Sequence, residues 1–377
     1  MGPLSGLKVV EFAGIGPGPF AAMLMADLGA EVIRIDRKQP SGLGMYRPPE
    51  LDYALRNRHA ISLDLKDQAG VELALKILDS ADALIEGFRP GVMERLGLGP
   101  QPCMVRNSRL VYGRLTGWGQ KGPLAQVAGH DLNYIALSGV LHAIGRAGQP
   151  PSIPLNLVGD YAGGSLYLVI GILSAILESR SSGQGQVVDA AIVDGVASLS
   201  TQLYGMLKAG VLNHERGSNS LDSGSHFYEV FECSDGEWIS IAPVEAKFYE
   251  LLLKKLDLVI DTQQLDRNGW AAAKMKMAKR FRSQTRDYWT ALLEGTDVCF
   301  APVLNLDEAM AHPHFIERGT YVEVAGHMQP GTAPRFSRTV PSKPTQGVAA
   351  SPATAHDALK GWLDAKEVDE AMTAGLL

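Results

Sequence analysis

The chain has 377 residues, of which 35 are lysine or arginine and 41 are aspartate or glutamate, so its formal net charge is −6. This length allows two or three domains with buried cores. Because the basic residues are scattered and never form a run of five, the charge pattern lacks the electrostatic footprint of a nucleic-acid-binding protein. A few local arginines are still enough to hold a small anionic ligand.

Cysteine usage and hydropathy set expectations about the compartment. Cys103, Cys233 and Cys299 are widely spaced, with no C-x-x-C pair and no histidine at metal-ligand spacing. We therefore expect a reducing cytoplasm and no metal site. The N-terminus lacks a basic segment that leads into an apolar stretch, and the longest apolar run, residues 166–177, is too short to cross a bilayer. A protein without a membrane-spanning segment is the expectation.

The first half of the chain alternates between strand-like and helix-like segments. Strands are expected at residues 8–13, 31–35, 60–65, 83–86, 110–116 and 187–192. Helices are expected up to residue 28 and at 70–80, 92–96 and 161–179. This alternation predicts an open α/β domain with a mostly parallel sheet.

One segment after the first predicted strand imitates a nucleotide-binding motif. Residues 16–21, with Asp36 twenty positions beyond the first glycine, satisfy the loose dinucleotide fingerprint. Pro17 and Pro19, however, remove two backbone donors from the loop that would have to cradle a pyrophosphate. The sequence therefore argues against a nicotinamide dinucleotide.

After about residue 195 the pattern changes to that of a smaller α+β domain. A polar loop at 213–225 precedes a hairpin at 227–243, which is followed by helices near 246–256, 271–282 and 285–294. We expect a large domain at residues 1–195, completed by 330–377, and a small domain at 227–315. Residues 196–226 and 316–329 are expected to be linkers, and a last helix is expected near 355–364.

An imidazole and a carboxylate stand out as candidate bases. His130 lies in Gly129-His-Asp-Leu-Asn-Tyr, and Asp160 precedes the long apolar run, so we expect Asp160 to begin a helix with free N–H groups. Two bases and a helix N-terminus suit the removal of a weakly acidic proton next to a carbonyl, with stabilisation of the oxyanion. On residue type alone, each has a structural alternative, as an N-cap and as a surface histidine.

Several longer motifs follow one another along the chain. They are Leu4-Ser-Gly-Leu-Lys-Val-Val-Glu, Gly16-Pro-Gly-Pro-Phe, Glu86-Gly-Phe-Arg-Pro-Gly-Val-Met-Glu-Arg-Leu-Gly, Thr116-Gly-Trp-Gly-Gln, Gly129-His-Asp-Leu-Asn-Tyr, Asn156-Leu-Val-Gly-Asp and Cys299-Phe-Ala-Pro-Val. In this order they resemble the α-methylacyl-CoA racemases of the family III CoA-transferase superfamily, from the first strand to residues 333–338. Members of that family invert the carbon that bears the 2-methyl group of an acyl-CoA thioester.

The resemblance implies roles for particular residues. His130 and Asp160 would serve opposite faces of a planar enolate, and Glu245 of the small domain would be hydrogen-bonded near the imidazole. The backbone N–H of Asp160 would hold the thioester oxygen. The resemblance also implies an interlocked homodimer in which the partner supplies Glu245, and no cofactor beyond the CoA of the substrate.

For the CoA moiety, the resemblance points to residues near the ends of the early strands. They are Arg37, the backbone of Ser62, Leu63, Asp64 and Leu65, then Gly87, Arg89, Arg95, Gly129 and Tyr134. Guanidinium groups stay charged and bind phosphate through two donors. Arg37 and Arg89 are favoured because both follow predicted strands, and the ligand crevice of an open α/β sheet lies beyond the C-terminal strand ends.

Two other functions fit the same motifs. A family III CoA-transferase would use Asp160 as a nucleophile and form an acyl-enzyme anhydride, although such an enzyme needs no second base like His130. A non-catalytic acyl-CoA-binding protein would keep the fold without the chemistry, but all three candidate residues are present. The acyl group stays open between a branched fatty chain, a sterol side chain and a 2-aryl group.

Overall fold

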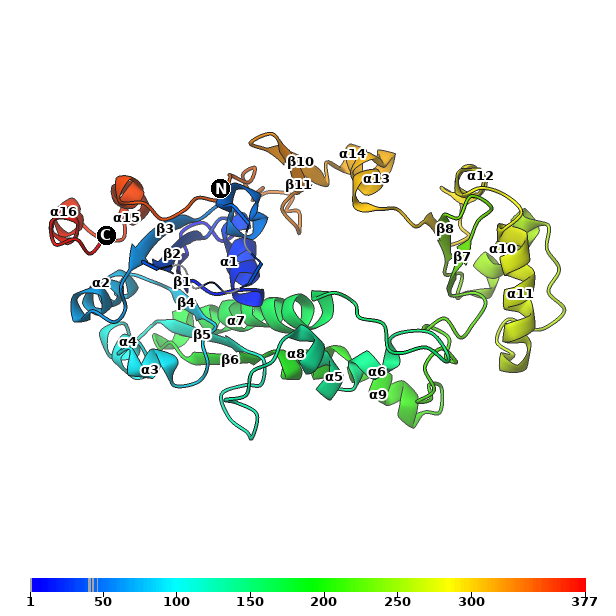
Figure 1. The fold of residues 1–377 in the computed structure, drawn as a ribbon, viewed down its shortest axis with the longest axis horizontal. Coiled ribbons are helices and arrows are strands. Elements are labelled where there is room, and N and C mark those ends of the chain that lie inside the picture. Colours follow the sequence, from blue (N-terminus) through cyan, green and yellow to red (C-terminus); the bar gives the residue numbers. More distant parts are fainter. Residues whose placement is uncertain (1, 40–41, 43, 46) are drawn as a thin grey trace. The chain divides into compact units, whose positions relative to one another are not determined.

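The computed structural model describes residues 2–39, 42, 44–45 and 47–377, and these form two compact units (Figure 1). The first unit contains the chain up to residue 137 together with residues 155–199 and 313–377. The second unit contains residues 138–154 and 200–312. The chain thus leaves the first unit and returns to it twice.

A six-stranded parallel sheet forms the centre of the first unit. Its strands are β1 (Lys8–Phe12), β2 (Glu31–Arg37), β3 (His59–Leu63), β4 (Ala83–Glu86), β5 (Val111–Thr116) and β6 (Val187–Ala191), in the spatial order β3-β2-β1-β4-β5-β6. Every neighbouring pair is parallel. The predicted parallel sheet is confirmed. Its central strands are buried on both faces and are mostly apolar, with one buried charged residue in each: Glu11, Arg34, Glu86 and Arg114.

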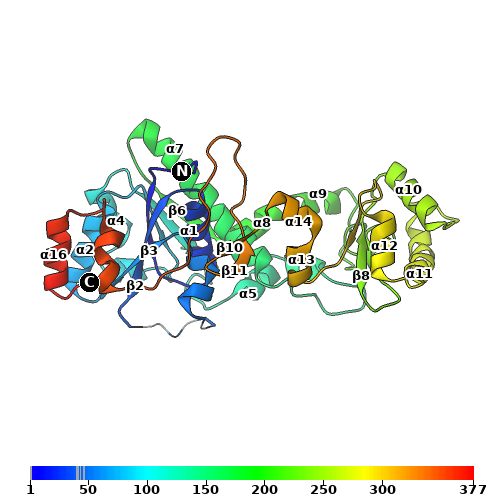
Figure 2. The ribbon, with the colours of Figure 1, turned by 90° about the horizontal axis from the view of Figure 1, so that it is seen from above.

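Helices cover both faces of this sheet (Figure 1 and Figure 2). On one face lie α1 (Pro17–Asp27) and α7 (Tyr167–Ser182), which contact each other and the strands. The opposite face packs against α2 (Gln68–Leu78), α4 (Pro100–Arg106), α15 (Ala355–Leu359) and α16 (Ala365–Thr373) in one hydrophobic core. The C-terminal segment therefore adds helices to the domain that the N-terminal half begins.

Residues Leu157–Leu166 form a π-helix that continues into α7. Three of its glycines are buried, and the backbone at Gly163 lies directly against Gly195 of α8 (Ile192–Leu199). The Ser165 hydroxyl donates to the carbonyl groups of Pro17 at 2.7 Å and Asp160 at 3.1 Å. This close packing of backbone on backbone accompanies a widened turn of a kind that is frequent at functional sites.

The contact between these two helices predicts a large effect of Gly195→Ala. A Cβ at Gly195 would lie 1.9 Å from the carbonyl oxygen of Gly163, so we expect a loss of roughly 2 kcal/mol in the free energy of unfolding. Gly205→Ala, in the exposed interior of α9 (Thr201–Lys208), meets no atom within 4 Å and should instead stabilise by about 0.5–1 kcal/mol. Urea unfolding followed by circular dichroism compares the two; equal midpoints would contradict the packing argument.

Together the π-helix and α7 form one long apolar helix. Residues Leu157–Ser182 span 26 residues with a mean hydropathy of 1.6 over their most apolar window, which is enough by length and composition to cross a membrane. Half of that window is buried inside the fold. The helix is therefore longer than the apolar run at 166–177 on which the sequence expectation rested.

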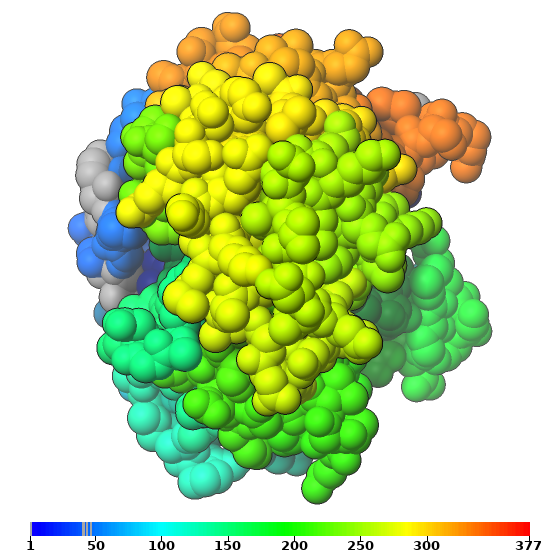
Figure 3. Space-filling view, turned by 90° about the vertical axis from the view of Figure 1, so that its right-hand side faces the viewer, coloured from blue at the N-terminus to red at the C-terminus, as the bar shows by residue number. Residues whose placement is uncertain are grey.

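The second unit contains a three-stranded antiparallel sheet and a layer of helices. Its strands are β7 (Glu229–Glu232), β8 (Trp238–Ile241) and β9 (Phe300–Pro302), and its principal helices are α10 (Ala246–Leu256), α11 (Trp270–Phe281) and α12 (Arg286–Leu293). The predicted hairpin and three helices are confirmed. Figure 3 faces the helical side of this unit, in lime and yellow. Stacked and edge-on aromatic rings fill its core, with Phe281 contacting both Phe231 and Trp289.

The structure divides the chain differently from the sequence in three places. Residues 196–226, expected as a linker, contain the end of α8 and all of α9, and from residue 200 they belong to the second unit. Residues 138–154 belong to the second unit, because Arg216 donates to the carbonyl groups of His142 and Gln149 at 2.7 and 2.5 Å. Residues 316–329, expected as a linker, contain most of a hairpin of β10 (Tyr321–Val324) and β11 (His327–Pro330) in the first unit. Gln329 of this hairpin accepts from the buried guanidinium of Arg56, which attaches the hairpin to the sheet domain.

The remaining elements are short. They are α3 (Val92–Arg95), α5 (Asp131–Leu137), α6 (Val140–Ala143), α13 (Leu306–Ala311), α14 (Pro313–Arg318) and the 3-10 turns Pro49–Leu51, Tyr53–Leu55, Arg267–Gly269 and Pro352–Thr354. Of these, α5 carries side chains of the candidate site.

Candidate active site

A cavity of about 690 Å³ lies in the first unit, at the C-terminal end of the parallel sheet. Its lining comes mainly from the segments that follow β1, β2, β4 and β5, with further residues at 125–134. In the strand order of this sheet, β1 and β4 are neighbours from which the chain winds away in opposite directions. Ligands of doubly wound sheets bind at such a switch point.

Many of the predicted site residues meet in this cavity. Those that line it are Arg37, Gly87, Arg89, Gly129, His130, Tyr134 and Asp160. Glu245 belongs to the second unit, where it is exposed and precedes α10 as its N-cap residue.

Other residues predicted to bind CoA lie outside this lining. The described lining does not include Ser62, Leu63, Asp64, Leu65 or Arg95. Leu63 is buried in the hydrophobic core at the end of β3, and the Asp64 carboxylate accepts the backbone N–H of Lys66 at 2.9 Å. The segment after β3 turns directly into α2, whereas the segments after β1, β2, β4 and β5 border the cavity.

Asp160 lies inside the π-helix, as its fourth residue. The helix begins at Leu157 with Asn156 as its N-cap residue, so the prediction that Asp160 begins a helix is wrong. The helix starts earlier than predicted because the segment from Asn156 to Gly159 already forms the first part of the widened turn. The Asp160 carboxylate accepts from the Asn156 amide at 3.3 Å. Burial raises the pKa of the Asp160 carboxyl, the charge of Asp131 raises it further, and Asn156 and His130 oppose these effects.

Asp131 is a site residue that the sequence prediction missed. Its Oδ2 accepts the backbone N–H of Asp160 at 2.7 Å, so the expectation that this N–H is free to hold a thioester oxygen is wrong. Asp131 is buried, and its Oδ1 has no hydrogen-bond partner among the described residues. A Cβ at residue 159 would lie 2.5 Å from Asp131 Oδ2, so only glycine fits there. In the sequence, the only signs of this contact were two pairs of adjacent residues, His130 with Asp131 and Gly159 with Asp160.

His130 is exposed and immediately precedes α5. Its backbone N–H donates to Asn133 Oδ1 at 3.0 Å, and its carbonyl accepts the Asn133 N–H at 2.8 Å. These reciprocal bonds hold the backbone at the start of the helix. The imidazole is therefore carried on a fixed turn while its ring borders the cavity.

Tyr134 forms part of the cavity wall. Its hydroxyl donates to the Gly129 carbonyl, and its ring meets the Trp118 ring edge-on, with centroids 4.8 Å apart. Burial, followed by the charge of Asp160, raises the pKa of Tyr134 to about 12. The phenol is therefore neutral at physiological pH, and it shapes the cavity without adding charge.

Gly16 brings the first loop close to the carboxylate. Its φ of 69° and ψ of −118° suit glycine, and a Cβ there would lie 3.4 Å from Asp160 Oδ2. The segment that imitates a dinucleotide fingerprint therefore borders Asp160, where a side chain would fill the space beside the carboxylate.

Arg37 and Arg89 place positive charge at the strand ends. Both are exposed and line the cavity, and the Arg37 guanidinium lies 5.5 Å from the centre of the Phe88 ring. A cation on an aromatic face is held in place while it keeps its donors free. The cavity therefore combines two anion-binding groups with an imidazole and a carboxyl whose pKa is raised. Among the described residues, no cluster of three metal-binding side chains occurs.

Comparisons with known proteins agree with this architecture. A family model described as CoA-transferase family III matches residues 4–357. The chain is 42% identical to the alpha-methylacyl-CoA racemase of Mus musculus over 344 residues, which cover 90% of this chain and 88% of the mouse protein. It is also 42% identical to the Homo sapiens protein of the same name over 321 residues, with 85% and 82% coverage.

Solved structures give the same result for the fold. A CaiB/BaiF family protein from Brucella suis superimposes with a TM-score of 0.83 at 26% identity, covering 96% of this chain and 100% of that chain. A hypothetical protein from Mycobacterium tuberculosis gives 0.77 at 26% identity, with 96% and 99% coverage. Since the family match spans nearly the whole length and the sheet, cavity and motifs agree with it, this chain belongs to the CoA-transferase family III.

Proposed function

We propose that this protein is an isomerase that inverts the α-carbon of 2-methylacyl-CoA thioesters. The observation that carries the proposal is that His130 and Asp160 line one cavity, in a chain 42% identical to proteins named alpha-methylacyl-CoA racemase. One base removes the α-proton to form a planar enolate, and the other returns a proton to the opposite face. No cofactor is needed beyond the CoA carried by the substrate.

The raised pKa of Asp160 suits this role. A base is most effective when its pKa lies near the working pH, because it then accepts a proton strongly and is still largely deprotonated. Burial moves the Asp160 carboxyl toward that range, whereas an exposed aspartate would be a weaker base. The enolate oxygen needs a hydrogen-bond donor other than the Asp160 N–H, which Asp131 already accepts.

Arg37 and Arg89 are the groups we propose for the phosphates of CoA. Both stand at the C-terminal strand ends that line the cavity. Guanidinium groups bind phosphate through paired donors. Two of them give this cavity local positive charge, although the net charge of the chain is negative. The thioester would then reach from this anchor to His130 and Asp160 in the same cavity.

An interlocked homodimer is the assembly that we propose. The support within this chain is an exposed apolar face on the helix 157–182, where Ile170 is 60% and Leu177 is 65% exposed. Large exposed apolar surface of this kind usually marks an interface. Gel filtration should give a mass of two chains, and in the dimer Glu245 of the partner would complete the site. A mass of one chain with full activity would contradict the dimer.

We also place the protein in a reducing cytoplasm. Its three cysteines are free, and burial raises the pKa of the Cys103 thiol to about 12 and that of Cys233 to about 11. Thiols of this kind are unreactive, and neither is a candidate nucleophile.

Deuterium exchange tests the isomerase proposal. A 2-methylacyl-CoA of one configuration is incubated in D2O without an acceptor acid, and both α-deuteration and loss of optical purity are followed. We expect both to occur together. No exchange, combined with formation of a new acyl-CoA once an acceptor acid is added, would support the CoA-transferase alternative. Binding without either reaction would support the non-catalytic alternative.

A further inference from the structure

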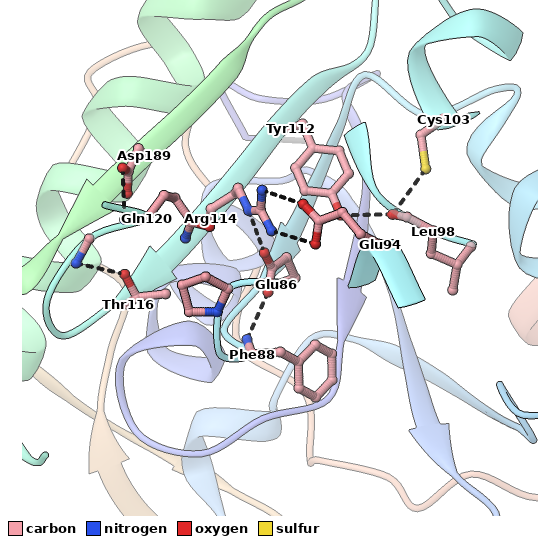
Figure 4. Close-up of polar contacts among 12 residues, drawn as sticks. Glu86, Phe88, Glu94, Leu98, Cys103, Tyr112, Arg114, Thr116, Gln120 and Asp189 are labelled. Atoms are coloured by element: carbon pink, nitrogen blue, oxygen red, sulfur yellow. Dashed lines mark hydrogen bonds and ion pairs between the residues drawn. The ribbon is translucent and has the colours of Figure 1, made fainter. Parts of the chain in front are cut away.

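A network of charges, buried at Glu86 and Arg114 and exposed at Glu94, lies beneath the turn that follows β4 (Figure 4). Glu86, the last residue of β4, is fully buried, and Arg114 on the neighbouring strand β5 donates from Nε to Glu86 Oε1 at 2.9 Å. Nη1 and Nη2 of Arg114 donate to the two carboxylate oxygens of Glu94 on α3, at 2.8 and 3.2 Å. Because Glu86 and Arg114 are register partners in adjacent strands, the sheet itself sets this geometry.

The second oxygen of Glu86 reaches the cavity-lining turn. Oε2 accepts the backbone N–H of Phe88 at 2.7 Å. The Phe88 ring carries the guanidinium of Arg37, and the next residue along the turn is Arg89. One carboxylate therefore holds the backbone segment that carries Arg89 and the ring that lies beside Arg37.

Stability alone does not account for this network. A buried ion pair is weak evidence for stability, since well-packed apolar side chains of similar size often serve as well or better. Burial also disfavours the charged form of Glu86 and raises its pKa, whereas the hydrogen bond from the Phe88 N–H and the charge of Arg114 lower it. An apolar pair could not supply an acceptor for the Phe88 N–H, whereas Glu86 does.

We propose that Glu86 is a positioning residue for the CoA moiety. It holds the turn 87–90 so that Arg89 meets the CoA phosphates in a prearranged geometry. Glu86 itself does not touch the ligand and acts through Arg89. This inference rests on the proposed acyl-CoA substrate.

The test is a double-mutant cycle on the binding of free CoA, measured by isothermal titration calorimetry. In Glu86→Gln the single carbonyl oxygen is taken by the cationic Arg114, so an NH2 group faces the Phe88 N–H, which loses its acceptor, and we expect the Kd to rise about tenfold. Arg89→Ala should weaken binding by at least as much. If Glu86 acts through Arg89, the double variant should bind no more weakly than Arg89→Ala alone. An unchanged Kd in Glu86→Gln, or fully additive effects, would overturn the proposal.

Asp27→Asn is the matched control for destabilisation. Asp27 is also a buried acid paired with an arginine, Arg56, but it does not line the cavity. It should lower the unfolding temperature and leave the Kd for CoA unchanged. If Glu86→Gln does not fold, Glu86→Met combined with Arg114→Met removes both buried charges and the acceptor of the Phe88 N–H, and the same rise in the Kd is expected.

Kinetics separate this proposal from the isomerase proposal. In Glu86→Gln the KM for the acyl-CoA should rise by the same factor as the Kd, while kcat stays within about twofold. If the unmodified protein binds CoA without exchanging the α-proton, the isomerase proposal fails and the binding cycle still decides the role of Glu86. If it does not bind CoA at all, both proposals fail.

Discussion

Asp160→Asn and His130→Ala are each expected to lower the rate of inversion by about 10³-fold, since a positioned acid or base contributes roughly 10²–10⁴-fold. Inversion needs proton transfer on both faces of the enolate, so the loss of either base slows it strongly. CoA binding should persist in both variants because Arg37 and Arg89 are unchanged. Full activity in either variant would contradict the two-base mechanism.

Epimer-specific exchange makes this prediction sharper. With one base left, the variant can still remove and return a proton on that face, so one epimer should exchange deuterium without inversion and the other should not. Asp160→Asn and His130→Ala should retain opposite epimers. Asp82→Asn serves as the matched control, because Asp82 accepts the backbone N–H of Lys8 at 2.8 Å and does not line the cavity. Loss of exchange from the same epimer in both variants would contradict opposed bases.

Asp131→Ala should lower the rate of inversion by about 10²-fold, because small displacements of a catalytic group have effects of that size. The change removes the acceptor of the Asp160 N–H and leaves that donor and the start of the π-helix without their anchor. Asp131→Asn keeps an acceptor of the same shape and should retain much more activity. Rates for the two variants, measured at saturating substrate, test whether the anchor matters; equal rates would show that it does not.

Asp131→Asn should also move the pH profile. Burial is the main cause that raises the pKa of the Asp160 carboxyl, and the Asp131 charge raises it further. Asn156 and His130 lower it. Removing the Asp131 charge therefore lowers the pKa of Asp160. Since Asp160 must be deprotonated to accept the α-proton, the acidic limb of kcat/KM should move to lower pH. A limb that does not move would show that the Asp131 charge has no influence on Asp160.

The architecture of the sheet domain could be predicted from local sequence. Parallel strands covered on both faces are mostly apolar, so β1, β2, β4 and β5 were visible as short segments with valine, isoleucine or leucine, although each also carries one buried charged residue in its interior or at its end. Arg37 and Arg89 could be placed at the cavity for the same reason, since Arg37 is the last residue of β2 and Arg89 lies in the turn after β4. The motif order, rather than any single residue, identified His130 and Asp160.

Boundaries between the two units were harder to predict, because they depend on contacts between distant segments. Residues 138–154 have no local feature that separates them from the large domain. Their place in the second unit follows from Arg216 and from the ion pair between Arg146 and Glu229. In the same way, the hairpin at 321–330 is attached through Arg56, far earlier in the chain.

By itself, the sequence determined the α/β sheet, the small α+β domain and the two candidate bases, because these depend on periodicity and on motifs within short stretches. Only the tertiary structure decided that Asp160 lies inside a π-helix and that Asp131, 29 residues away, accepts its backbone N–H. The same holds for Glu86, whose link to Arg114 exists only because β4 and β5 are neighbours in the sheet. These contacts join segments whose spacing along the chain carries no information about their distance in space.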